Sequence, residues 1–228
     1  MKLCVALDLQ NSQENLNLVK EIKDFNVWLK VGFRTYLRDG KKILEDIKNI
    51  NPNFKIFLDL KLYDIPNTMA DAAEEINELG LVDMFNIHAS AGFEAMNTVV
   101  NRLKGASNPP LILAVTALTS FDNSSFKAIY GEDIDKKAKE FAINSFQAGL
   151  DGVVCSAFES FNIKANTNQD FITLCPGIRP FNENSQDQKR VADINFAKKN
   201  LVDFIVVGRP IYQNKNPKDI VSKILQNI

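Results

Sequence analysis

Eight short apolar runs rich in β-branched and aromatic residues recur along the chain, and segments with helical periodicity lie between them. The runs cover residues 3–8, 27–32, 54–60, 84–89, 111–118, 152–156, 171–178 and 204–207. Several are apolar at successive positions, which is typical of parallel strands covered on both faces. Amphipathic stretches at 67–79, 133–148 and 217–228 indicate helices. The pattern predicts strand and helix in regular alternation.

The chain length decides how these units assemble. Eight β-α units in 228 residues average about 28 residues each, close to the minimum for a parallel crossover. Little chain then remains for a second domain, and we predict a single (β/α)8 TIM barrel over residues 1–228, with its active site at the C-terminal ends of the strands. A doubly wound open sheet is the alternative. Its dinucleotide-binding form favours G-x-G-x-x-G after the first strand, where this chain has Asp8-Leu9-Gln10.

Composition excludes several other classes. Hydrophobic residues make up 45% and charged residues 24%, as in an average folded protein, and the formal net charge of -1 argues against nucleic-acid binding. No apolar run approaches the roughly 20 residues that a membrane span needs. Cys4, Cys155 and Cys175 lie inside apolar runs and are expected to be free, buried thiols, and a single histidine argues against structural zinc. We expect a cytoplasmic protein with no membrane partner.

The densest cluster of charge follows the third run. Asp59 and Lys61 are two residues apart, so on a strand they point to the same side, and Asp64 follows in the loop before Pro66. Asp8 ends the first run and Lys30 lies near the end of the second. Charges therefore converge from three consecutive strand ends, which favours a functional site, although a structural ion pair sealing the barrel mouth is the alternative.

Two Gly-Arg corners follow the last two strands. They are Gly177-Ile178-Arg179 and Gly208-Arg209, where many barrels bind phosphate through backbone N–H groups and a guanidinium. Glycine turns and solvated arginines that merely end strands are the alternative. The polar connections 119–135 and 180–188 are lid candidates, and Gln188 could reach the site or have no role there.

The sequence allows two roles for several polar residues at strand ends. His88 ends the fourth run, where a general base could lie, but a hydrogen-bonded structural histidine fits equally. Thr116, Thr119 and Ser120 could bind the polar edge of a ligand or cap the following turn.

The segment from Asp59 to Thr68, Asp-x-Lys-x-x-Asp-Ile-Pro-Asn-Thr, closely resembles the orotidine 5'-phosphate decarboxylase family in its bacterial form, whose enzymes make UMP and CO2. The resemblance spans the whole chain, because further segments look like that family's strand ends in the same order. These segments are Val5-Ala6-Leu7-Asp8, Leu29-Lys30-Val31-Gly32, Asn86-Ile87-His88-Ala89, 115–120, Pro176-Gly177-Ile178-Arg179-Pro180 and Val207-Gly208-Arg209-Pro210.

The resemblance implies a role for each matching residue. Lys61 would be the proton donor in an alternating array with Lys30, Asp59 and Asp64, and Asp64 would complete the site of a neighbouring subunit in a homodimer. Substrate would be bound by Asp8, Lys30, Thr68, Thr119, Arg179, Gln188, Gly208 and Arg209. The substrate would be orotidine 5'-monophosphate, with no metal and no organic cofactor.

The chemistry of that reaction agrees with the charges. Loss of CO2 from the pyrimidine leaves a carbanion that the ring cannot delocalise, and an ammonium beside that carbon stabilises it. Magnesium-dependent sugar-phosphate decarboxylases and aldolases of the same superfamily are one alternative, but they typically have Glu where this chain has Lys30. A non-catalytic phosphate-ligand sensor is the other, although it would be expected to lose Lys61 or Asp59.

Overall fold

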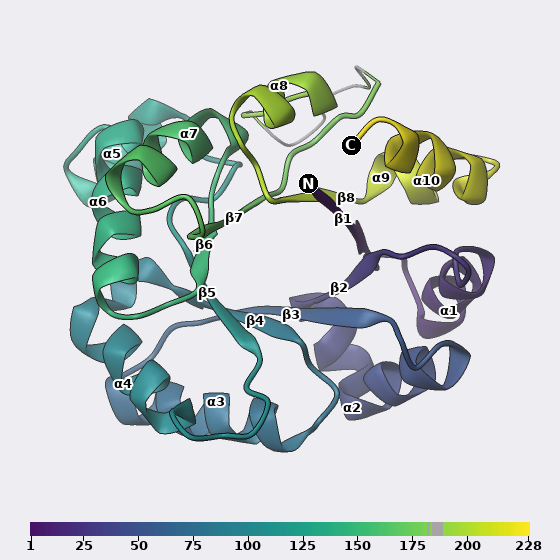
Figure 1. Cartoon of the computed structure of the whole chain (residues 1–228), viewed down its shortest axis with the longest axis horizontal. Coiled ribbons are helices and arrows are strands. Elements are labelled where there is room, and N and C mark those ends of the chain that lie inside the picture. The colour runs from purple at the N-terminus through teal and green to yellow at the C-terminus, as the bar shows by residue number, and fades with distance from the viewer. Residues whose placement is uncertain (182, 184–188) are drawn as a thin grey trace.

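Eight parallel strands form a closed barrel in chain order in the computed structural model, which describes residues 1–181, 183 and 189–228. Figure 1 looks into the ring of strands and shows the helices around it. The strands are β1 (Lys2–Ala6), β2 (Trp28–Gly32), β3 (Lys55–Leu62), β4 (Met84–His88), β5 (Leu111–Val115), β6 (Gly152–Val154), β7 (Ile172–Cys175) and β8 (Phe204–Val207). The predicted (β/α)8 barrel is confirmed.

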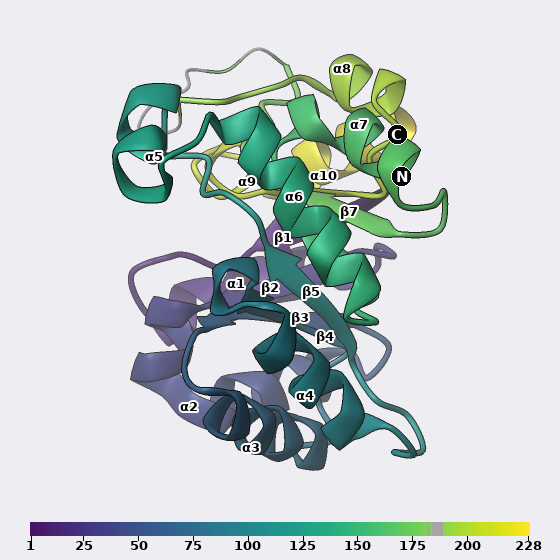
Figure 2. The same ribbon diagram turned by 90° about the vertical axis from the view of Figure 1, so that its left-hand side faces the viewer.

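Helices follow the strands and cover the outside of the barrel, as Figure 2 shows for α3, α4 and α6. Among the described helices, none is both long and apolar enough to cross a membrane. They are α1 (Ser12–Glu21), α2 (Phe33–Ile50), α3 (Pro66–Glu78), α4 (Phe93–Leu103), α5 (Asn123–Tyr130), α6 (Ile134–Gln147), α7 (Ala157–Asn166), α8 (Ile194–Lys199), α9 (Arg209–Tyr212) and α10 (Pro217–Gln226), with a short 3-10 turn, η1 (Ala89–Ala91).

The predicted strands differ from the observed ones mainly at their C-terminal ends. The run 152–156 ends early as β6 because Ser156 becomes the N-cap of α7, in a capping box with Glu159. The run 111–118 likewise stops at Val115, and the connection that follows contains α5, which the sequence pattern did not predict. Asp122 caps α5 in a second capping box with Ser125. These departures leave polar and turn-forming residues at the mouth of the barrel.

Strand alternation separates two apolar layers. Inward side chains such as Phe57, Leu113 and Phe204 fill the barrel, whereas outward ones such as Ile56 and Phe85 pack beneath the helices. Because the side-chain period of a strand is two, the inward series continues into Asp8 after β1 and includes Asp59 in β3. The interior packing therefore ends in charged groups at the C-terminal end of the barrel.

All three cysteines are buried and free, as expected. Cys4 lies inside the barrel, and burial raises the pKa of its thiol. Cys155 directly follows β6 and Cys175 ends β7, both on the outer side of the barrel, with their Sγ atoms 3.8 Å apart. Sequence spacing did not indicate that proximity, because pairing of β6 with β7 brings them together.

Candidate active site

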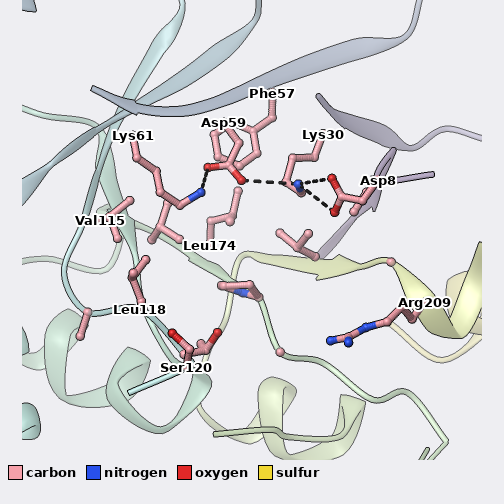
Figure 3. A pocket seen from close by; sticks show the side chains of 18 of the residues that line it. Asp8, Lys30, Phe57, Asp59, Lys61, Val115, Leu118, Ser120, Leu174 and Arg209 are labelled. Atoms are coloured by element: carbon pink, nitrogen blue, oxygen red, sulfur yellow. Dashed lines mark hydrogen bonds and ion pairs between the residues drawn. The ribbon is translucent and has the colours of Figure 1, made fainter. Parts of the chain in front are cut away.

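A cavity of about 300 Å³ opens at the C-terminal ends of the strands (Figure 3). Its lining draws on the ends of β1, β2, β3 and β5 to β8, as the barrel prediction requires. The predicted site residues that line it are Asp8, Lys30, Asp59, Lys61, Thr119, Arg179, Gly208 and Arg209. Gln188 lies outside the described residues.

Four alternating charges form one wall of this cavity. The Lys30 ammonium is 3.1 Å from Asp8 Oδ1 and 3.5 Å from Asp59 Oδ2. Lys61 Nζ lies 2.5 Å from Asp59 Oδ1. Figure 3 shows the four side chains in a row, with Arg209 and Ser120 across the cavity from them. Of the predicted array, Lys30, Asp59 and Lys61 are thus in contact within one chain, and Asp8 extends the row. Asp64 is not part of it.

Burial and mutual contact set the charge state of the array. Burial would raise the pKa of Asp59, but the charges of Lys30 and Lys61 and hydrogen bonds from Lys61 and Asn86 lower it below its ordinary value. Burial would lower the pKa of Lys30, and the carboxylates of Asp59 and Asp8 instead raise it to about 12. Near neutral pH, Lys30 is therefore an ammonium and Asp59 a carboxylate.

The two lysines differ in access to the cavity. The Lys30 side chain is 11% exposed and is held between two carboxylates, whereas the Lys61 side chain is 36% exposed. Gly32 leaves room for the inner pair, because a Cβ at that position would lie 2.9 Å from Lys30 Nζ and 3.0 Å from Asp8 Oδ1. Lys61 therefore has the more accessible amino group of the two.

An asparagine that sequence reasoning did not assign to the site holds the array from behind. Asn86 in β4 is completely buried, donates from Nδ2 to Asp59 Oδ1 at 2.8 Å and accepts from the Lys61 backbone N–H at 2.7 Å. The signal available in the sequence was a polar residue within the apolar run 84–89. Buried amides of this kind need partners, which is why such a residue indicates a hydrogen-bonded network.

The two predicted Gly-Arg corners meet at the same cavity. Gly177 has φ +80°, a conformation that favours glycine, and the turn is fixed by hydrogen bonds between Arg179 N and Ala192 O and between Ala192 N and Gly177 O. Gly208 precedes α9, which Arg209 begins. Both arginines line the cavity, and guanidinium and backbone N–H groups are the kinds of donor that bind anions.

Asp64 and Thr68 do not line the cavity of their own chain. Both are exposed; Asp64 lies in the loop between β3 and α3, and Thr68 in the first turn of α3. The Asp64 carboxylate accepts a hydrogen bond from the N–H of Ile65. The sequence motif that joins them to Lys61 is therefore divided between the cavity and the outer rim.

The polar residues left open by the sequence separate in the structure. Thr119 and Ser120 line the cavity, whereas Thr116 turns its hydroxyl to the Val154 carbonyl. His88 Nδ1 lies 2.7 Å from Ser90 Oγ, and its ring stacks on Tyr63. Burial, followed by the nearby Lys61 charge, lowers the pKa of His88, so its ring is neutral at pH 7.

The side chains present suit organic anions. Across the described ranges 1–181, 183 and 189–228, no three His, Cys, Asp or Glu side chains are placed to hold a metal ion. In the array, the Lys30 ammonium lies between the carboxylates of Asp8 and Asp59, where it offsets part of their charge. The fold and site define a (β/α)8-barrel enzyme with a charged array beside a cationic corner.

Comparisons with known proteins identify the family. The model of the orotidine 5'-phosphate decarboxylase / HUMPS family matches residues 1–224, and the chain belongs to that family. A Nitratiruptor protein named orotidine 5'-phosphate decarboxylase is 64% identical over 228 residues, covering 100% of both chains. One of the same name from Campylobacter concisus is 59% identical, again over 100% of both. These relatives carry the name of a carboxy-lyase.

Solved structures agree with this family. The crystal structure of orotidine 5'-phosphate decarboxylase from Lactobacillus acidophilus has a TM-score of 0.85 and 30% identity, covering 99% of this chain and 98% of that one. An uncharacterized conserved protein from Geobacillus kaustophilus also has a TM-score of 0.85, at 26% identity, with 99% of each chain covered.

Proposed function

We propose that this chain, residues 1–228 acting as one catalytic domain, converts orotidine 5'-monophosphate to UMP and CO2 in pyrimidine biosynthesis, without a metal or organic cofactor. The observation that carries the proposal is the row Asp8–Lys30–Asp59–Lys61 along one wall of a cavity whose other side holds Arg209. Full-length relatives at 59–64% identity with the name of this enzyme support it.

Substrate binding divides between the two sides of the cavity. The phosphate is bound at the Gly-Arg corners by Arg179, Arg209 and the backbone of Gly208, with Gln188 as a further ligand. Asp8 and Lys30 bind the ribose hydroxyls, and Thr119 lies beside the pyrimidine. Binding energy from the phosphate, which is remote from the reacting carbon, then orients the ring against Asp59 and Lys61.

The chemical step uses Lys61. In orotidine 5'-monophosphate the bond from the pyrimidine ring carbon C6 to the carboxylate carbon breaks. CO2 leaves, and the electron pair stays on C6 as a carbanion. The adjacent ammonium stabilises that charge electrostatically and then transfers a proton from Nζ to C6, after which solvent reprotonates the amine. Asp59 lies 2.5 Å from Lys61 Nζ and orients it, and its negative charge faces the departing carboxylate.

We further propose a homodimer in which Asp64 and Thr68 complete the neighbouring site. Support comes from their position on the rim and from the exposed apolar side chains around it. These side chains follow β2, β3 and β4 and are Phe33, Leu37, Tyr63, Ile65 and Phe93, each at least half exposed. Apolar groups gathered on one rim fit a protein interface better than solvent.

Mixed dimers test that arrangement. Neither Lys61→Ala nor Asp64→Asn alone should support turnover, but an equal mixture, unfolded and refolded together, should regain roughly a quarter of wild-type activity, because half the dimers then carry one intact site. If Asp64 served its own chain, every site would carry a defect and the mixture would stay inactive.

The reaction itself is tested by the ultraviolet absorbance of orotidine 5'-monophosphate with purified protein, with and without EDTA. We expect an EDTA-insensitive change to the UMP spectrum. No spectral change and no binding would favour the magnesium-dependent sugar-phosphate class, and binding without turnover would favour a phosphate-ligand sensor. The three free thiols fit a reducing compartment, and we propose that the enzyme acts in the cytoplasm.

A further inference from the structure

Asn86 is a buried polar side chain whose two ends have different partners. It lies in β4 on the barrel-facing side, between Met84 and His88. Its Nδ2 donates to Asp59 Oδ1 at 2.8 Å, and its Oδ1 accepts from the Lys61 backbone N–H at 2.7 Å. A backbone N–H can only donate and a carboxylate can only accept, so the site requires a side chain that offers one acceptor and one donor.

The backbone at Lys61 is strained. Lys61 has φ +52°, in the left-handed region that is unfavourable for residues with a Cβ. The register between β3 and β4 shifts between Leu58 and Leu62, so this conformation belongs to an irregularity in the strand. Such a conformation persists where the surrounding structure stabilises it, and here the Asn86 amide oxygen accepts a hydrogen bond from the Lys61 N–H.

Both contacts converge on the proposed reacting pair. Asp59 Oδ1 accepts from Asn86 Nδ2 and also from Lys61 Nζ, the latter at 2.5 Å. The amide thus holds the carboxylate at one end and the backbone of the lysine at the other. Asn86 does not itself line the cavity. Any effect it has on catalysis must pass through Asp59 and Lys61.

We infer that Asn86 is a positioning residue for decarboxylation: it fixes the Asp59 carboxylate and the left-handed Lys61 backbone in the relative geometry that directs the Lys61 ammonium into the cavity. The inference rests on the proposed function for its kinetic consequence, whereas the geometry can be tested without it. By this inference β4 contributes a hydrogen-bonding side chain to the array, whose charged residues lie on or directly after β1, β2 and β3.

The test compares Asn86→Leu and Asn86→Asp with wild type and with a matched control, Thr116→Val. Leucine removes both hydrogen bonds, whereas an aspartate carboxylate can accept from the Lys61 N–H but repels Asp59. Thr116 is as deeply buried, its hydroxyl donates to the Val154 carbonyl of β6, and it does not itself line the cavity. Each protein is assayed for kcat on orotidine 5'-monophosphate, for UMP affinity by calorimetry, and for melting temperature.

We expect kcat to fall about 10²-fold in both Asn86 variants, since a displacement of about 1 Å costs that much. UMP affinity should stay within about threefold, because the phosphate and ribose contacts remain, and the control should match wild type. If kcat and UMP affinity fell together, Asn86 would be a structural residue only, and if kcat held in the soluble variants it would have no role. If Asn86→Leu does not fold, the nearly isosteric variant Asn86→Asp provides the test of the positioning role.

Crystal structures of wild type and of the Asn86 variants separate this inference from the proposed function. Wild type without activity on orotidine 5'-monophosphate would refute the function alone. The inference predicts that Lys61 leaves its left-handed conformation in Asn86→Leu, and that in both variants Lys61 Nζ moves beyond hydrogen-bond distance of Asp59. Unchanged geometry of both residues in the variants would overturn it, whatever the activity.

Discussion

Replacement of Lys61 by alanine removes both the charge and the proton that the proposed reaction needs at one carbon. The Lys61 side chain is 36% exposed at the cavity, whereas Lys30, at 11%, is held between two carboxylates and cannot substitute for it. Loss of an electrostatic stabiliser costs about 10²–10³ in rate and loss of a general acid about 10²–10⁴. Together they predict a fall in kcat of about 10⁴–10⁷, or roughly 5–10 kcal/mol.

The assay follows the absorbance change of orotidine 5'-monophosphate, with the proposed dimer checked by light scattering and UMP binding by calorimetry. Dimer and UMP binding should persist, because the phosphate corners and the rim are untouched. Lys55→Ala is the control, since Lys55 begins the same strand at its opposite end and is 56% exposed. Activity of Lys61→Ala within about tenfold of wild type would remove Lys61 from the proton-donor role.

Three further predictions concern other parts of the site. Arg209→Ala should raise KM for orotidine 5'-monophosphate by about 10²-fold or more, while activity on the phosphate-free nucleoside barely changes; equal losses on both substrates would refute the phosphate assignment. Lys61→Gly should have a free energy of unfolding about 1 kcal/mol higher than that of Lys61→Ala in denaturant titrations, because glycine tolerates φ +52°. Equal stability of the two variants would refute the argument that the backbone is strained at this position. The lowered pKa of His88 means that the unfolded chain binds its proton more readily. Denaturant titrations should therefore show stability falling as pH drops from about 7 to 5, and less so in His88→Gln; parallel curves would refute this.

Local pattern was sufficient for the fold class and for most of the charged array. Alternating apolar runs are a local property, and the period of two along a strand already puts Asp59 and Lys61 on one side. In a parallel barrel every strand ends at the same rim, so Asp8, Lys30 and Arg209 were expected to meet there, and they do. Strand ends were less accurate, because Ser156 serves as a helix cap rather than continuing β6.

Features of the site that arise from contacts between distant segments depend on the tertiary structure. Asn86 is 25 residues from Lys61, and only the pairing of β3 with β4 brings its amide to that N–H. The left-handed backbone of Lys61 likewise follows from the irregular register rather than from local preference, which disfavours it. Sequence by itself determined which charges reach the rim, because periodicity is local; the tertiary structure decided how they are oriented, because orientation depends on neighbours that the fold supplies.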